Sequence, residues 1–203
     1  SHLLIIVVLI TLLFYFFIIP DEGIFSILLA VISSVSTSGI SIYSSNFDVS
    51  LFFILMTIIG GSLISTSSGF KYIRFYILLK ISYQEIYKLV KPKNIFNRNL
   101  FRSDSQFDDQ DTKIAFLVFI SFIFAIFILS SILALDTLSF ENSFKLSILT
   151  LTNTVASSIY GMDNLMFFDM NSFTKMSLMI FMIFGKIEII ALLFLIKKFI
   201  FRE

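Results

Sequence analysis

An almost unbroken run of Ile, Leu, Phe, Val and Ala extends from residue 113 to residue 135 and constrains the fold more than any other feature. A helix of about 20 apolar residues spans the hydrocarbon core of a bilayer. Residues 3–19 and 173–201 form similar runs, and residues 51–89 form a longer one that is interrupted. Hydrophobic residues make up 57% of the chain, whereas soluble domains contain about 45 to 50%. The sequence therefore predicts an all-α integral membrane protein.

The interruption lies in residues 60–74, where glycines and hydroxyl side chains gather ahead of Lys71 and Arg74. Its small and polar residues include Gly60, Gly61, Ser65, Thr66, Ser67, Ser68 and Gly69. Lipid offers no hydrogen-bond partners, so irregular backbone at membrane depth survives only where protein or a water-filled cavity surrounds it. The segment thus predicts a pore or transport pathway. Helix packing through small residues is the alternative.

Two apolar segments, residues 24–35 and 142–156, are too short to cross a bilayer and are expected to be re-entrant. The first precedes a loop of Ser36, Thr37, Ser38 and Gly39, and the second precedes Ser158, Ile159, Tyr160 and Gly161. A half-crossing helix directs its C-terminal carbonyls into the membrane, and rings of carbonyls are what replace the water shell of K⁺ in potassium channels. Each loop taken alone also fits an ordinary connection.

The two halves of the chain share one order of elements: spanning helix, acidic turn, short helix, hydroxyl-rich loop ending in Gly, and longer helix. We expect one unit over residues 1–88, a solvated linker over 89–112 and a second unit over 113–203. Tandem repeats often enclose the pathway of a transporter at their interface. The predicted fold is therefore a tandem pair of helix, pore helix, filter loop and helix, as in a potassium-channel-like pore.

Nine of the fifteen Lys and Arg residues lie between Lys71 and Lys113, and three more cluster at the C-terminal end. The positive-inside rule then makes the linker and the C-terminus cytoplasmic. The chain has no Cys, and its one histidine is His2, so no triad or thiolate metal site can be assembled in the apolar segments. A membrane enzyme is disfavoured, and we expect neither an organic cofactor nor a nucleic-acid partner.

Lys186 and Glu188 interrupt the last apolar run. Charges within a bilayer are costly and usually mark a pathway. Residues two apart on a helix point to different faces, so the two are not expected to pair with each other. The functional interpretation places Lys186 at the pore as an electrostatic barrier. A buried structural network is the alternative.

These motifs resemble the Trk/Ktr family of potassium uptake proteins. The resemblance is carried by Gly60-Gly61 with residues 65–74, and by Gly185-Lys186-Ile187-Glu188, which is similar to a Gly-Arg-Leu-Glu motif of the family's fourth repeat. It runs along essentially the whole chain and covers the family's C-terminal half, its third and fourth repeats. By this resemblance the chain is expected to be a fragment of a longer protein.

The resemblance implies a four-repeat pore that takes up K⁺ across the bacterial cytoplasmic membrane. K⁺ would be held by filter carbonyls at residues 36–39 and 158–161, above an intramembrane gating loop at residues 60–69 that Lys186 faces. The resemblance also implies a homodimer and a cytosolic nucleotide-binding regulatory subunit.

Several positions depart from the family pattern. Ser38 and Ser68 stand where Thr and Gly are usual, Lys186 replaces Arg, and the second filter lacks the usual Asn-Val-Gly-Pro-Gly. The register of the second filter and the choice between K⁺ and Na⁺ therefore stay open. A Na⁺-permeable transporter and a non-conducting membrane subunit derived from such a transporter remain alternatives.

Overall fold

The computed structural model describes residues 2–18, 23–40, 49–60, 69–90, 109–136, 138–154, 156, 158–162, 167 and 170–186. Most of these residues are helical, as the sequence predicts. The elements in chain order are α1 (His2–Leu13), the π-helical turn η1 (Phe14–Ile18), α2 (Ile24–Val35), α3 (Ser50–Ile58), β1 (Ile59–Gly60), β2 (Phe70–Lys71), α4 (Tyr72–Val90), α5 (Asp109–Ala134), α6 (Phe140–Leu151), the 3₁₀ turn η2 (Ser158–Tyr160) and α7 (Ser172–Lys186).

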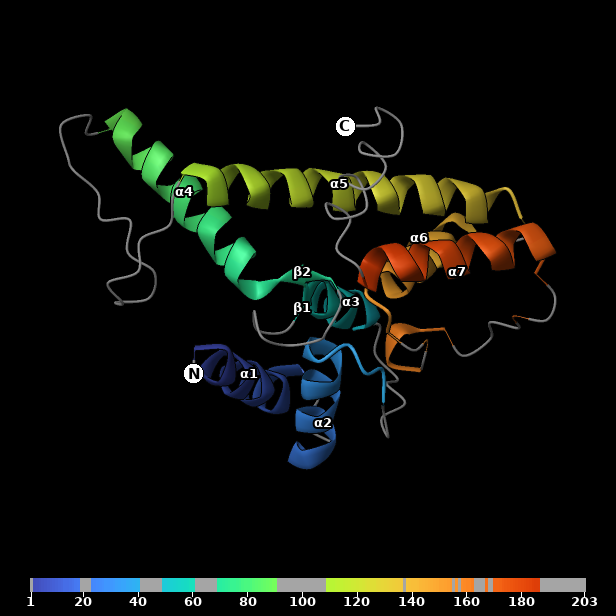
Figure 1. Cartoon of the computed structure of the whole chain (residues 1–203). Coiled ribbons are helices and arrows are strands. Elements are labelled where there is room, and N and C mark those ends of the chain that lie inside the picture. The colour runs from blue at the N-terminus through green and yellow to red at the C-terminus, as the bar shows by residue number, and fades with distance from the viewer. Residues whose placement is uncertain are drawn as a thin grey trace.

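The helices form two groups joined at the centre (Figure 1). In one group α1 packs against α2, and in the other α6 packs against both α5 and α7. The two short strands lie between the groups, and α4 runs outward from them toward the beginning of α5 (Figure 1). Contacts of α3 with α2, α6 and η2 connect the two groups.

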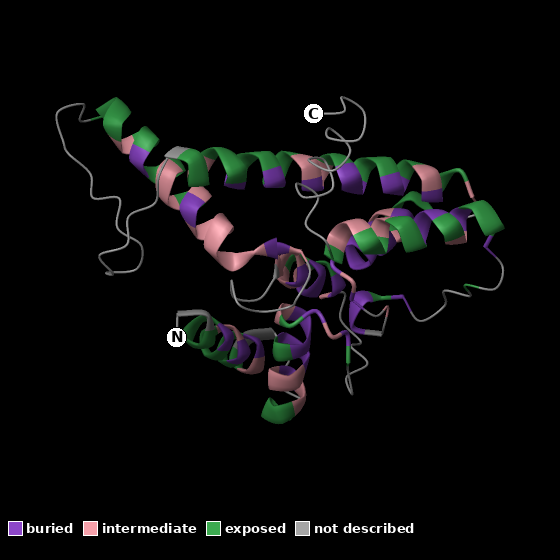
Figure 2. Ribbon diagram, in the orientation of Figure 1, coloured by how far each residue is buried: buried purple, intermediate pink, exposed green. Residues whose placement is uncertain are grey.

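Helix α5 is apolar on all sides. Its buried face repeats every three or four residues at Ala115, Val118, Phe122, Ala125, Ile126, Leu129 and Leu133. The opposite face exposes further large apolar side chains, among them Phe116, Phe124 and Phe127. Figure 2 shows buried and exposed stretches alternating along α5. A helix with this pattern is stable where lipid rather than water covers its outer face.

Among the described residues, α5 alone is long and apolar enough to cross a membrane, over Gln110–Ala134. Helices α1 and α2 are apolar but shorter. The interrupted run at residues 51–89 is divided into α3 and α4, and α4 carries several Lys, Arg, Tyr and Glu side chains that lower its hydropathy. The last predicted span is described only as far as Lys186.

The two short helices compare differently with their predicted bounds. Helix α2 covers Ile24–Val35 as predicted. Helix α6 covers Phe140–Leu151, so the predicted segment at 142–156 is wrong at both ends. It starts early because Ser139 caps it by accepting a hydrogen bond from the Asn142 N–H. It stops early because Asn153 takes a left-handed conformation, with φ 53°. Helix α4 ends at Val90 and α5 begins at Asp109. Both ends of the expected linker, residues 89–112, are therefore helical.

The sequence predicts that the apolar run of residues 51–89 is interrupted, and this is confirmed, because strands β1 and β2 separate α3 from α4. Strands β1 and β2 pair in parallel, with Ile59 opposite Phe70 and Gly60 opposite Lys71. The chain therefore leaves the helical path and returns beside its point of departure. Because the two strands are parallel, the chain runs in the same direction in β1, before the break, and in β2, after it.

Aromatic side chains link the break and η2 to neighbouring helices. Phe70 of β2 is buried against Phe119 of α5, with ring centroids 5.6 Å apart. In η2, Tyr160 is fully buried, and its hydroxyl lies 3.3 Å from the Ser34 hydroxyl of α2. The core is thus continuous from α2 to the segment that follows α6.

Candidate functional site

Helix α6 is enclosed by protein along most of its length, since every residue from Lys145 to Thr152 is buried. Its polar side chains are satisfied locally: the Ser147 and Thr150 hydroxyls each donate to the carbonyl four residues earlier at 2.7 Å. Helix α2 follows the same rule, because the Ser34 hydroxyl donates to the Ala30 carbonyl at 2.9 Å. Such hydroxyls cost little to bury because they remain hydrogen-bonded.

Helix α2 ends in a tight turn at Ser36, Thr37 and Ser38. The end residue Ser36 has φ −81° and ψ −3°, and Thr37 follows with φ 58°. Three successive N–H groups turn back into the helix. They are Ser36 N–H to Ile32 O at 2.8 Å, Thr37 N–H to Ser34 O at 3.2 Å and Ser38 N–H to Ser33 O at 3.0 Å. This is the pattern of a Schellman motif, which usually places Gly at the left-handed residue.

Helix α6 ends in a turn of the same geometry at Thr152, Asn153 and Thr154. Thr152 has φ −83° and ψ −3°, and Asn153 has φ 53°. The equivalent bonds are Thr152 N–H to Ile148 O at 2.9 Å, Asn153 N–H to Thr150 O at 3.1 Å and Thr154 N–H to Leu149 O at 2.9 Å. We call residues 36–38 the first turn and residues 152–154 the second turn.

The first turn holds a strained residue. Thr37 is β-branched and buried, and β-branched side chains are rare at positive φ because Cβ crowds the backbone. A left-handed residue of this kind costs about 1–2 kcal/mol. Strain of this size tends to gather at functional sites. The next glycine, Gly39, is buried and has φ 71°.

The residues predicted for the second filter lie beyond the second turn. Ile159 and Tyr160 are fully buried within η2. A Cβ added to Gly161 would lie 3.5 Å from the Nζ of Lys145, a buried cation paired with Glu141 at 2.6 Å. Ser158 begins η2. The geometry of residues 36–38 recurs at 152–154 instead.

Sequence reasoning missed the second turn because it used Gly161 as the marker of the filter. The available signal was the run Thr152-Asn153-Thr154, which follows a short helix as Ser36-Thr37-Ser38 does. Asn tolerates the left-handed conformation that the turn requires. No glycine was therefore needed there.

The base of the break lies against the second turn. A Cβ added to Gly69 would lie 3.1 Å from the Thr57 carbonyl and 3.4 Å from Cγ2 of Thr152. Gly60 lies in β1. The other residues of the predicted gating loop, Gly61, Ser65, Thr66, Ser67 and Ser68, lie outside the described residues.

The predicted pore charges are spread over three elements. Lys186 is exposed at the described end of α7, and its neighbour Gly185 touches the end of α6. Lys71 lies in β2 and Arg74 in the first turn of α4, both half-buried. Glu188 lies outside the described residues. Gly185 and Gly69 thus approach the second turn from two different segments.

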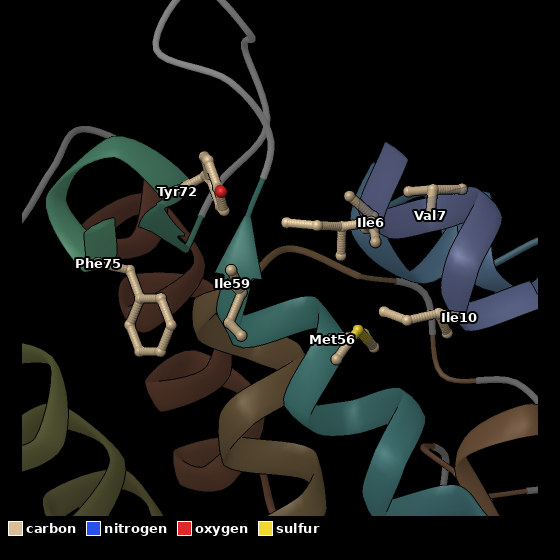
Figure 3. A pocket seen from close by; sticks show the side chains of 8 residues that line it. Ile6, Val7, Ile10, Met56, Ile59, Tyr72 and Phe75 are labelled. Carbon is tan, nitrogen blue, oxygen red and sulfur yellow. The ribbon is translucent and has the colours of Figure 1, made fainter. Parts of the chain in front are cut away.

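A pocket of about 180 Å³ lies beside the break, between α1, α3 and the start of α4. Figure 3 shows Ile6 and Ile10 of α1, Met56 of α3, Ile59 of β1 and Tyr72 of α4 around it. Its lining is apolar apart from the Tyr72 hydroxyl, so it offers few ligands for a hard cation. Within the described part of the chain, no three His, Cys, Asp or Glu side chains gather as a metal site would require.

Comparison with known proteins relates this chain to solved structures by fold. No protein-family model and no curated protein sequence matches the chain. Among solved structures, the fold is similar to that of the potassium transporter TrkH from Vibrio parahaemolyticus, with a TM-score of 0.78 and 20% sequence identity. The match covers 94% of this chain and 42% of the TrkH chain. The chain thus has the fold of part of that transporter and spans less than half of its length.

Proposed function

We propose that this chain forms part of a membrane pore that takes up K⁺, as the Trk/Ktr resemblance and the TrkH-like fold lead one to expect. The observation that carries the proposal is the pair of matching turns at the ends of two short, apolar or buried helices. Three N–H groups in each turn bond back into the helix, so the carbonyls beyond the helix end are free of the helical ladder. Carbonyls presented in this way are suited to replacing the hydration shell of K⁺.

The first filter segment is proposed at Ser36, Thr37, Ser38 and Gly39. For the second unit, the shared backbone geometry favours the second turn, Thr152 to Thr154, over residues 158–161. The buried Lys145 near Gly161 supports this choice, because a fixed ammonium repels a nearby cation. Residues 158–161 then serve as packing against α2, α3 and α6.

The break at residues 60–69 is proposed as the gate, with Lys186 as the charge that stabilises its closed position. Two contacts support this: Gly69 approaches Thr152, and Gly185 approaches the same helix end from α7. A gate placed here would lie directly against the proposed filter. Lys71 and Arg74 follow the break and are proposed to set the positive potential at its cytoplasmic side.

The proposed setting follows the resemblance. We place the protein in a bacterial cytoplasmic membrane, in contact with lipid through the exposed apolar face of α5. A homodimer and a cytosolic nucleotide-binding subunit on the basic side belong to the same proposal. The linker and the C-terminus would lie on that side.

The test is the exchange of Gly39 for Val in cells that lack other K⁺ uptake systems. Gly39 has φ 71°, which a β-branched residue adopts only with strain, so Gly39→Val is expected to reduce K⁺-dependent growth and Rb⁺ influx at least tenfold. Gly23→Val is the matched control, because Gly23 has φ −65° and a Cβ there would meet only the Ser26 Oγ, at an ordinary contact distance of 3.8 Å. Equal influx in Gly39→Val and parent would refute the filter assignment, provided that both proteins reach the membrane.

The same influx assay separates the alternatives. Equal Na⁺ and K⁺ influx in the parent would favour a Na⁺-permeable transporter. No influx of either ion would favour a non-conducting subunit.

A further inference from the structure

Asn153 connects two elements that are distant in sequence. Its side-chain Nδ2 donates a hydrogen bond of 2.9 Å to the carbonyl of Met182 in α7. Its backbone, with φ 53°, forms the left-handed corner of the second turn. One residue therefore shapes the turn and attaches it to a neighbouring helix.

The contact between α7 and the end of α6 is unusually close. A Cβ added to Gly185 would lie 1.9 Å from the Leu151 carbonyl oxygen and 3.1 Å from the Asn153 Nδ2. No side chain larger than hydrogen fits there unless the backbone of α7 or of the second turn shifts. The backbone of α7 at Gly185 thus packs directly against Leu151, the residue that precedes the second turn.

The first turn is stabilised in a different way. The hydroxyls of Ser33 and Ser38 lie 3.0 Å apart, and the Ser36 hydroxyl donates to the Ser33 carbonyl at 3.3 Å. These bonds all lie within the first turn and its own helix. Thr37, which occupies the position of Asn153, carries no amide group that could reach another helix in the same way.

We infer that Asn153 is a positioning residue that fixes the second turn to α7, so that the location of its carbonyls depends on where α7 lies. The inference rests on the proposed pore function. It predicts that a movement of the α7 segment around Gly185 and Lys186 is transmitted to the second turn and not to the first. The two turns then differ in role, since the second is bonded to α7, whereas the first is held within α2, whose Ser34 bonds to Tyr160 of η2.

The variant Asn153→Gly tests this inference, because Gly keeps the left-handed backbone and removes the amide. Amide hydrogen exchange of the purified protein is expected to quicken at residues 152–154 by about fivefold, the factor that corresponds to ~1 kcal/mol for one lost hydrogen bond. Exchange at residues 36–38 serves as the internal reference and should not change. Asn153→Asp, which keeps the size but removes the donor, should resemble Asn153→Gly.

The second readout is the ratio of K⁺ to Na⁺ influx. A misplaced second turn should lower this ratio at least threefold in Asn153→Gly and in Gly185→Ala, whereas Gly23→Ala should match the parent because a Cβ there makes only an ordinary contact of 3.8 Å with the Ser26 Oγ. Unchanged exchange at residues 152–154, or faster exchange with an unchanged ratio, would overturn the inference. A parent without K⁺ influx would instead overturn the proposed function, while the exchange data would still report on the bond between Asn153 and α7.

Discussion

Thr37 and Asn153 occupy the same left-handed position in the two turns but differ in how well they tolerate it. Thr is β-branched and strained at φ 58°, whereas Asn adopts this conformation more readily. Thr37→Gly is therefore expected to raise the free energy of unfolding by about 1 kcal/mol. Asn153→Gly is expected to lower it, since it relieves little strain and loses the bond to Met182. Thermal unfolding in detergent measures both changes.

A destabilised Thr37→Gly protein would contradict this account, because it would mean that the Thr37 side chain contributes more by packing than its backbone costs. If the variant is more stable but transports less, the strain serves function. That outcome would agree with strain at other functional sites.

Single residues were predictable where a glycine marked them. The loop at residues 36–39 was placed correctly after α2, since Gly39 follows a helix whose apolar run stops at Val35. The second turn was missed, because its left-handed residue is Asn153 and the nearest following glycine, Gly161, belongs to a different segment. Sequence pattern does not report which of several polar residues takes positive φ. Nor does it report the bond of Asn153 to Met182 of α7, which joins residues distant in sequence.

At the scale of the elements, the N-terminal end of α7 is bonded to Asp136, which lies in the turn directly after α5. The Asp136 carboxylate accepts hydrogen bonds from the Asn171 N–H at 3.1 Å, the Asn171 side chain at 2.9 Å and the Thr174 hydroxyl at 2.7 Å. A carboxylate here satisfies N-terminal donors of α7 and interacts favourably with its dipole. Asp136→Ala is expected to cost about 2 kcal/mol of stability.

The control for this prediction is Glu85→Ala, which removes an exposed ion pair with Lys88 on α4. Exposed pairs of this kind contribute little, so a change below about 0.5 kcal/mol is expected. Denaturation in detergent at neutral pH compares the two variants. Equal effects of Asp136→Ala and Glu85→Ala would show that Asp136 is a surface residue without a capping role.

Helix ends were harder to predict than helices. Every helix over the described residues overlaps an apolar segment seen in the sequence, but α6 ends at Leu151 although apolar residues continue at Val155 and Ala156. Helix α5 begins at Asp109, and the carboxylate of Asp111 in its first turn favours the positive end of the helix dipole. From the sequence alone, residues 109–112 are assigned to the linker because of their charges. Hydrophobic pattern identifies what is buried, whereas capping and dipole interactions decide where a helix stops.

At the scale of the whole molecule, the predicted orientation can be tested because the chain contains no cysteine. Leu135, which is 88% exposed beyond α5, is expected on the outer side, and Ser103 in the linker on the inner side. In intact cells a membrane-impermeant maleimide should label Leu135→Cys but not Ser103→Cys. After the membrane is permeabilised, both should react. The reverse labelling in intact cells would contradict the charge-based orientation.

The overall arrangement was predictable only in outline. Composition and apolar runs indicate a helical membrane protein, and the fold similarity to TrkH agrees with that class. The contact of Tyr160 with Ser34, and the approach of Gly69 and Gly185 to the end of α6, join residues more than 30 positions apart in every case. Such contacts follow from how helices dock. Local sequence pattern does not contain that information.

The parallel pairing of β1 with β2 also bears on how this protein can be engineered. Since the chain leaves and rejoins the break in the same direction, with Ile59 beside Phe70 and Gly60 beside Lys71, extra residues placed between the strands would not reverse the direction of α4. The entropy of closing such a loop grows only slowly with its length. A short spectroscopic tag placed in the break would therefore leave the inside-outside sequence of the following helices unaltered.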